Sequence, residues 1–250
     1  MSDLDAPSSP VAPRAAADAT RPLKPRDAAT MIVVDRSTGD PRVLLGKRRA
    51  DVAFMPSKYV FPGGRVDPGD RRMAVEDDLV ARDIKRLQVS MKGAPPSAAR
   101  ARALAFAAIR ETFEETGLVI GRATASLPAG AAAPGWSEFL SLGFVPALSR
   151  LTFFARAITP PGRPRRFDAR FFFVEATAIA HRIELAEDGE LSSLDWRTIE
   201  EAKELDLPRI TRAVLEDLRD RLTRSTSAAA DDPVPFYYQR NGSFRRDLIT

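Results

Sequence analysis

Apolar and polar residues along the chain alternate in patterns that predict both strands and helices. Two β-rich runs, Ala28–Val34 and Arg42–Lys47, flank a turn cluster at 36–40 and predict a β-hairpin. The end of the chain is apolar and aromatic at Val234–Tyr238, so we expect it to pack back on the domain. Further strands are predicted at 59–61, 118–120, 151–158 and 170–178, and further helices at 136–143, at 208–224 and from 198 onward.

One predicted helix is better defined than the others. Ala101–Ile109 is rich in Ala and Leu, which favour helix. Ser97 follows two prolines and is a suitable N-cap, because its hydroxyl can accept a hydrogen bond from a free backbone N–H. Gly117 suits the left-handed conformation that ends many helices. We therefore expect one helix from about 97 to 117.

The second half of this helix carries three acids. Glu111, Glu114 and Glu115 are spaced i, i+3 and i+4, which places their carboxylates on one helical face. Such close anions repel one another unless a cation lies among them, and clustered oxygen ligands suit Mg²⁺ or Mn²⁺. Taken alone, the same pattern also fits a solvated acidic face.

A diglycine turn upstream changes that balance. Phe61-Pro62-Gly63-Gly64 precedes the helix, and Gly64 is followed by five residues and then Asp70. The run from Arg110 to Leu118 reads Arg-Glu-Thr-Phe-Glu-Glu-Thr-Gly-Leu. Together these stretches resemble the signature of the Nudix hydrolases: Gly, five residues, an acid, seven residues, then Arg-Glu-aliphatic-x-Glu-Glu-x-Gly-aliphatic.

The chain departs from that signature in three ways. Asp70 replaces the usual Glu, and Thr112 stands where an aliphatic residue is usual. Residues 71–109 separate Asp70 from Arg110, where the family has seven residues. In an unbroken helix the position eight before Arg110 is Arg102, which is no acid. The first acidic ligand is thus either displaced to Asp70 or missing.

The segment 71–96 is therefore interpreted as an insertion within the motif. It contains one amphipathic helix, which could cover the site as a lid, contact a partner, or be a plain surface helix. Its apolar stripe comprises Leu79, Val80, Ile84 and Leu87, and its polar face Asp77, Asp78, Arg82, Lys85 and Arg86.

The resemblance implies an α/β Nudix fold, in which a mixed β-sheet is sandwiched between helices. It also implies metal-dependent hydrolysis of a nucleoside diphosphate linked to another group. The implied metal ligands are Glu111, Glu114, Glu115 and Asp70, with Glu115 or Glu114 as a catalytic base and Arg110 orienting the acids. Many members carry a further acid just before a Trp-containing strand. In this chain Glu190, which precedes Leu194-Asp195-Trp196, is by resemblance the candidate for this further metal ligand or general base, and Glu187 is the second candidate.

Several glycines and arginines are candidates for binding the substrate. Gly63 and Gly64 would let backbone approach a ligand closely, although paired glycines also make simple turns. Arg48 follows a predicted strand, and Arg165 and Arg166 lie in a Pro-rich loop; both stretches fit either phosphate contact or exposed loop. These arginine-bearing stretches, with the split motif, resemble a branch that includes coenzyme A diphosphatases. CoA or acyl-CoA is the leading candidate, and nucleotide sugars, dinucleotides and oxidised nucleotides stay open.

Composition sets the remaining expectations. The polar, Pro-rich residues 1–26 predict a disordered tail, and 27–250 a single hydrolase domain. The absence of cysteine excludes thiolate chemistry and fits a reducing, cytoplasmic setting. No apolar run is long enough for a membrane span. The net charge of +4 suits an anionic small-molecule substrate.

Other functions and partners stay open at this stage. A non-catalytic Nudix-fold binding or regulatory module is the alternative to an enzyme, and the broken motif favours it. RNA binding through the basic residues of the tail is a weaker reading than solvation of that tail. A homodimer is compatible with the sequence.

Overall fold

The computed structural model describes residues 23–52, 55–126, 133–185, 189–224 and 232–250. Within these ranges the helices are α1 (Ala81–Gln88), α2 (Ala98–Thr116), α3 (Ser137–Ser141), α4 (Ile199–Lys203) and α5 (Arg209–Leu222). The strands are β1 (Arg26–Asp35), β2 (Arg42–Arg48), β3 (Tyr59–Val60), β4 (Gly63–Arg65), β5 (Leu118–Ala123), β6 (Phe144–Pro146), β7 (Thr152–Ile158), β8 (Phe167–Glu175), β9 (Ile179–Arg182), β10 (Leu191–Thr198), β11 (Val234–Arg240) and β12 (Ser243–Ile249).

A large mixed sheet forms the centre of the molecule. Its strands follow the order β10-β2-β1-β8-β7-β11-β12, with β3 added beside β2 and β4 beside β1. The pairs β1–β8 and β7–β11 are parallel, and the other pairs in this sheet are antiparallel. A second, small sheet has the order β6-β5-β9. The predicted hairpin between the first two strands is confirmed.

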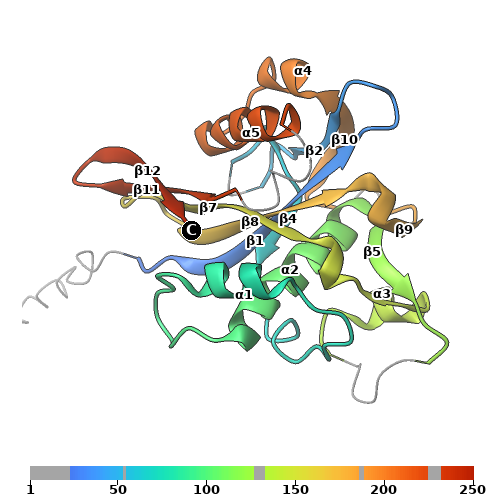
Figure 1. Ribbon diagram of the computed structural model, residues 1–250. Coiled ribbons are helices and arrows are strands. Elements are labelled where there is room, and N and C mark those ends of the chain that lie inside the picture. Colours follow the sequence, from blue (N-terminus) through green and yellow to red (C-terminus); the bar gives the residue numbers. More distant parts are fainter. Residues whose placement is uncertain (1–22, 53–54, 127–132, 186–188, 225–231) are drawn as a thin grey trace, which may run out of the picture.

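Helices cover both faces of the large sheet. In Figure 1, α4 and α5 lie above it, and α1, α2 and α3 lie below it. Each face has its own apolar core, one centred on α2 and the other on α5. The molecule is therefore the three-layer α/β arrangement expected from the sequence. None of the described helices is long and apolar enough to cross a membrane.

The helix that carries the acids begins and ends where its sequence predicts. The Ser97 side chain accepts a hydrogen bond from the Arg100 N–H at 3.2 Å. Gly117 takes a left-handed conformation with φ of 71°, and its N–H donates to the Phe113 carbonyl. A Cβ at this position would also lie 2.2 Å from the Ile183 carbonyl oxygen. Both caps are thus local features that fix the length of α2.

The insertion is packed into the lower layer of the molecule. Its helix α1 lies against α2 and β7, and Leu79 and Leu87 are buried in the core beside α2. The carboxylate of Asp78 accepts hydrogen bonds from Nε and Nη2 of Arg102 at 2.9 and 2.7 Å. Arg102 lies nine residues, about 13 Å of helix, before Glu111. The insertion therefore covers the first half of α2, away from the acids.

For two residues of the predicted amphipathic helix, the predicted burial is wrong. Val80, expected on the apolar face, is half exposed, whereas Arg86, expected on the polar face, is buried. Asp83 is also buried, because its carboxylate accepts the backbone N–H of Phe153 at 2.9 Å. Arg86 reaches the Asp232 carbonyl oxygen at 3.2 Å. Polar contacts to distant segments therefore decide which face of this short helix is buried.

The sequence pattern also does not predict a buried network of charged residues. Arg156 lies within an apolar strand, yet its guanidinium pairs with Asp168 at 2.8 and 2.7 Å. The same guanidinium donates to the carbonyls of Val89 and Ser90 at the end of the insertion. Arg170 is fully buried beside Asp168, and burial lowers its pKa to about 10. These contacts tie the insertion to the sheet.

Some strands differ from those that the sequence pattern predicts. The strand expected at 170–178 begins three residues earlier, because Phe167 pairs in parallel with Arg26. Arg26, assigned by composition to the tail, is the first residue of β1. The predicted return of Val234–Tyr238 to the domain is confirmed, and the unpredicted β12 completes a hairpin with it. Most of the predicted tail, residues 1–22, lies outside the described residues.

Candidate active site

The candidate site forms where the end of α2 meets the diglycine strand β4. The N–H of Gly63 donates to Oε2 of Glu115 at 2.9 Å. A Cβ on Gly64 would lie 2.3 to 2.4 Å from the carboxylate atoms of Glu111. A Cβ on Gly63 would lie 2.4 Å from the Ala29 carbonyl oxygen of the neighbouring strand. Gly64 is therefore required for the close approach between β4 and Glu111, and Gly63 for that between β4 and β1.

Burial changes the acidity of all three glutamates. Loss of solvent raises the pKa of Glu115 to about 8 and that of Glu111 to about 7. Burial also raises the pKa of Glu114, which is the most exposed of the three side chains. The carboxylates thus lie in a site with too little positive charge to offset their desolvation.

Arg110 lies at the centre of the acidic cluster and is almost fully buried. Its Nη1 donates to Glu114 at 2.9 Å, and its Nη2 lies 3.0 Å from Oε1 of Glu111. Its Nε and Nη2 hold the two oxygens of Asp70 at 2.9 and 3.1 Å. Nη2 also donates to the Arg65 carbonyl oxygen. This arginine therefore positions the acids and the start of the insertion together.

Asp70 is saturated with hydrogen bonds. Besides Arg110, it accepts the indole N–H of Trp136 at 3.0 Å and the backbone N–H of Asp67 at 2.8 Å. Its side chain has no exposed surface. These are the bonds of a carboxylate that holds Arg110 in place, and its predicted role as a metal ligand stays a prediction. Sequence reasoning missed Trp136, since nothing local in the chain connects it to the motif.

The three acids of α2 do not all point to one spot. Glu111 and Glu115 face β4, whereas Glu114 turns toward Arg110 on the more exposed side. Across the described ranges, no three His, Asp or Glu side chains converge into a ready-made metal site. Glu111 and Glu114 both lie against the Arg110 guanidinium, whereas Glu115 is held by the Gly63 N–H.

Arg48 and Glu190 lie beside the buried acids. They form an ion pair at 2.8 Å, between the end of β2 and the residue before β10. Arg48 lowers and Glu190 raises the pKa of Glu115 through their charges. Glu190 is well exposed, whereas Arg48 is mostly covered. The second candidate acid, Glu187, lies outside the described residues.

The basic loop lies farther away. Arg166 donates to the carbonyls of Thr159 and Leu23, and Arg165 is exposed. The Arg166 carbonyl accepts a hydrogen bond from the N–H of Arg26. Arg26 lies four residues before Thr30 in β1, and Thr30 pairs with Gly63. Four strand residues span about 13 Å. These arginines can therefore contact only a part of a substrate that lies well away from the acids.

No family model matches the chain, and no curated protein sequence matches it. A Nudix hydrolase from Alicyclobacillus acidocaldarius matches with 28% identity and a TM-score of 0.54, over 77% of this chain and 90% of that one. A C. elegans Ap4A hydrolase matches with 16% identity and a TM-score of 0.40, over 80% and 100%. The Nudix domain of Shewanella oneidensis NrtR, complexed with ADP ribose, matches with 11% and 0.44, over 80% and 90%.

Of these three, only the Alicyclobacillus structure has a TM-score above 0.5, so the fold is assigned from it. Its match covers most of both chains, and both sheet and helices follow the Nudix arrangement described above. The chain therefore has the Nudix fold. The structure that it resembles is a Nudix hydrolase, which agrees with the resemblance of Gly64, Asp70 and Arg110–Leu118 to that family's signature.

Proposed function

We propose that the protein is a metal-dependent hydrolase that cleaves the pyrophosphate bond of a nucleoside diphosphate linked to another group. One observation carries this proposal: Glu111 and Glu115, both half-buried, lie close together against the backbone of Gly63 and Gly64. Buried, closely spaced carboxylates are costly unless a cation accompanies them. A pyrophosphate substrate is itself polyanionic, so it can approach such acids only when cations lie between.

The residues present fit a hard divalent ion. Glu111, Glu114 and Glu115 offer carboxylate oxygens, which Mg²⁺ and Mn²⁺ prefer. The missing Cβ at Gly64 leaves room for the Glu111 carboxylate against the backbone of β4. A bound metal would neutralise the phosphates and lower the pKa of an attacking water. Glu111, Glu114 and Glu115 are therefore the proposed ligands.

The protein side chains would carry out the proton transfer and hold the ligands in place. The Gly63 N–H fixes one oxygen of Glu115, leaving the other free to accept a proton from water. Glu190 is the second candidate base, and its ion pair with Arg48 keeps it near Glu115. Arg110 is a positioning residue, because its buried guanidinium faces three carboxylates. Asp70 in turn positions Arg110.

CoA or acyl-CoA is the first substrate class to test. This choice rests on the resemblance of the Arg48-containing stretch, the split motif and the Arg165–Arg166 loop to coenzyme A diphosphatases. Gly63 and Gly64 would lie nearest the pyrophosphate, and Arg48 beside them. A long substrate is needed to reach Arg165 and Arg166, given their separation from the acids along β1.

A substrate panel tests the proposal. Purified protein is assayed with CoA, nucleotide sugars, dinucleotides and oxidised nucleotides, each with Mg²⁺, with Mn²⁺ and with chelator, and the products are identified by mass. We expect metal-dependent release of two phosphorylated products. Glu115→Gln should lower kcat at least a hundredfold, whereas Glu138→Gln, on the exposed surface of α3, should not. Metal binding without hydrolysis of any compound would instead indicate a non-catalytic binding module.

A further inference from the structure

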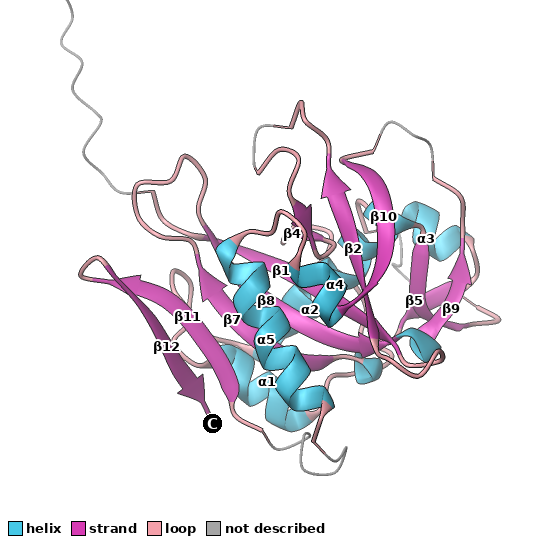
Figure 2. Ribbon diagram, turned by 90° about the horizontal axis from the view of Figure 1, so that it is seen from above, coloured by secondary structure: helices cyan, strands magenta, loops and turns pink. Residues whose placement is uncertain are grey.

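Strand β12 is an exposed edge of the large sheet. It is the last strand in the sheet order, and within the described ranges it pairs with β11 alone. Six of its seven residues are exposed. The β11–β12 hairpin projects beyond the helices in Figure 1 and forms the outer margin of the sheet in Figure 2. An unblocked edge of this kind can pair with a further strand through its backbone N–H and C=O groups.

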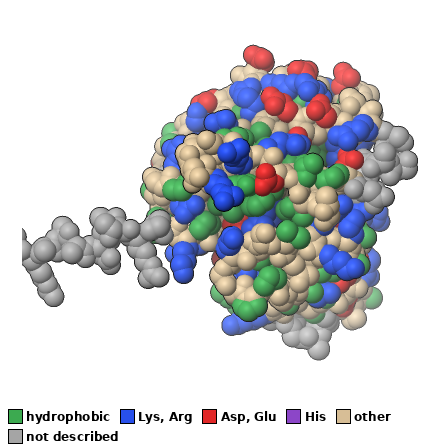
Figure 3. Space-filling view, turned by 60° about the vertical axis from the view of Figure 1, so that its left-hand side comes forward, with side chains coloured by type: hydrophobic (Ala, Val, Ile, Leu, Met, Phe, Trp, Pro, Cys, Tyr) green, Lys and Arg blue, Asp and Glu red, His purple; other side chains and the backbone are tan. Residues whose placement is uncertain are grey.

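The two faces of β12 carry different chemistry. On the α5 side, Phe244 stacks on Tyr237 and Arg246 donates to Asp217 at 2.8 Å, and Leu248 follows on the same face. Phe244 and Leu248 are 38% and 53% exposed, so this face of the edge strand has apolar surface that a further strand could cover. Figure 3, which brings this side of the molecule forward, shows green apolar side chains among blue and red ones.

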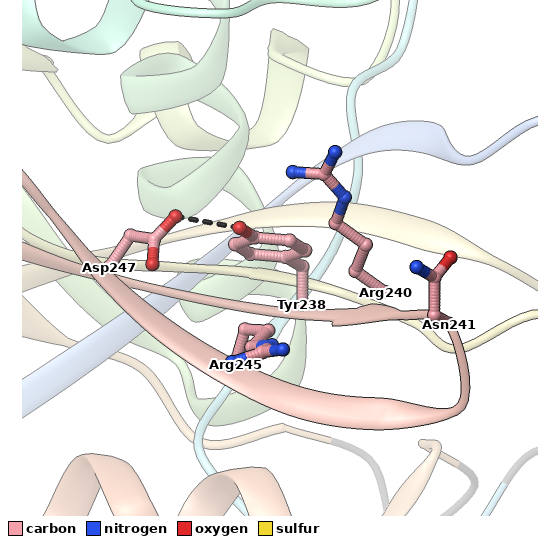
Figure 4. Close-up of a pocket in the computed structure, with 5 residues that line it drawn as sticks. All are labelled: Tyr238, Arg240, Asn241, Arg245 and Asp247. Atoms are coloured by element: carbon pink, nitrogen blue, oxygen red, sulfur yellow. Dashed lines mark hydrogen bonds between the residues drawn. The ribbon is translucent and has the colours of Figure 1, made fainter.

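The opposite face of β12 carries one charge of each sign. Arg245 and Asp247 line a surface hollow together with Tyr238, Arg240 and Asn241 of the hairpin (Figure 4). The Tyr238 hydroxyl donates to Asp247 at 2.6 Å. The edge therefore presents, in order, an apolar residue, a cation, a cation held by Asp217, an anion and an apolar residue.

We propose that β12 pairs antiparallel with β12 of a second copy of this chain, about a two-fold axis that passes beside Arg246. This register sets Phe244 opposite Leu248 of the second copy, and Arg245 opposite its Asp247. Symmetry makes each of these contacts twice. The contacts cover both exposed apolar residues. On the other face each charge meets an opposite charge, and such directly facing pairs stabilise the pairing of two strands.

Other two-fold registers fit the sequence poorly. In a two-fold antiparallel pair, facing residues must lie on the same face of the sheet, so the axis must pass beside a residue. An axis at Arg245 sets Phe244 opposite Arg246 and the two Arg245 side chains against each other. An axis at Asp247 sets the two Asp247 side chains together and Leu248 opposite Arg246. The charge pattern therefore favours the axis at Arg246 over the axes at its two neighbours.

The two Arg246 side chains that meet at this axis are already neutralised. Each guanidinium pairs with Asp217 of its own chain and also contacts the Tyr237 hydroxyl at 3.3 Å. The axis thus joins two ion pairs rather than two free cations. The self-complementary pattern of β12 favours a second copy over an unrelated strand as the occupant. The inference does not depend on the proposed hydrolase activity.

Cysteine cross-linking tests the register directly, because the natural chain contains no cysteine. Directly opposed residues of antiparallel strands have Cα atoms about 4.5 to 5.5 Å apart, within the range of a disulfide. Arg246→Cys should therefore form a disulfide-linked dimer under mild oxidation. Ser243→Cys is the matched control, since its two copies would lie about 20 Å apart in this register. We expect at least a tenfold faster cross-linking of the first variant; equal rates would overturn the proposal.

Charge exchange provides a second test that leaves Arg246 in place. Sedimentation of the full chain should show a concentration-dependent dimer of twice 27.4 kDa. Arg245→Asp and Asp247→Arg, each alone, should raise the dissociation constant at least tenfold, and the double exchange should restore it. Far-UV circular dichroism checks that each variant is folded. A wild-type protein that stays monomeric at hundreds of micromolar, or a double exchange that fails to restore the dimer, would overturn the proposal.

Discussion

Asp70 and Arg110 form a buried two-point ion pair, at 2.9 and 3.1 Å, although residues 71–109 separate them in the chain. Asp70 follows the diglycine strand and Arg110 opens the acidic half of α2, so the pair closes the base of the insertion. The first acid of the split signature and its arginine therefore meet in space despite the long interruption.

Removing the Asp70 carboxylate should destabilise the protein. Asp70→Ala leaves the buried Arg110 without its main partner, which costs about 3–5 kcal/mol when one member of a buried pair is lost. Chemical denaturation followed by circular dichroism measures this loss. Asp40→Ala, at an exposed position between β1 and β2, is the control and should cost less than about 1 kcal/mol. A loss as small as that of the control would show that Asp70 has no such structural role.

Trp136→Phe should have a smaller effect. Phenylalanine keeps the aromatic packing of Trp136 against Phe106 and Phe139, and removes the indole N–H that Asp70 accepts. Loss of one hydrogen bond to a buried carboxylate costs about 1–3 kcal/mol. In a double-mutant cycle with Asp70→Ala, the double variant should lose less stability than the sum of the two single losses. Full additivity of the two free energies would show that the two residues act independently.

Gly64→Ala should impair the site more than the fold. The added Cβ would lie within 2.4 Å of the Glu111 carboxylate, so that side chain must move. We expect Mg²⁺ affinity and kcat to fall at least tenfold, with a loss of stability of about 1–2 kcal/mol.

Gly39→Ala is the matched control for that variant. Gly39 has a positive φ and open space around it, so the methyl group meets no side chain and only backbone strain is expected. Stability should fall while activity stays the same. Equal kinetic effects of the two substitutions would argue against a role for Gly64 beside Glu111.

The metal-free protein should lose stability as pH rises from about 5 to 8. Glu111 and Glu115 have pKa values raised from 4.5 to about 7 and about 8 in the folded state. Between the unfolded and folded pKa values the folded state binds more protons, so the free energy of unfolding falls as pH increases. This contribution is fully present below pH 4.5 and is lost once pH passes the folded values.

Thermal melts of chelated protein across this pH range measure the effect. Glu115→Gln should flatten the pH dependence, because the amide does not titrate. Mg²⁺ should stabilise the protein most at the alkaline end, where both carboxylates are charged. Melting temperatures that rise steadily from pH 5 to 8 in chelator would contradict the assigned burial of these two acids.

The sequence by itself determined the local features of the site. The caps Ser97 and Gly117, the i, i+3, i+4 spacing of the acids, and the diglycine before them are short-range patterns, and each fixes backbone geometry over a few residues. The hairpin of β1 and β2 and the packing of α5 follow for the same reason, since alternation and helical periodicity mark the face each element buries.

Only the tertiary structure decided how distant segments complete these elements. Nothing in the spacing of Asp70, Trp136 and Arg110 shows that they share hydrogen bonds, because such contacts depend on how the chain closes. Arg156 and Asp83 lie buried where a hydrophobic pattern places charges at the surface, and partners far along the chain compensate them. The exposed edge at β12 likewise exists only because the sheet ends there. Local periodicity sets which elements form, and long-range polar pairing sets where they meet.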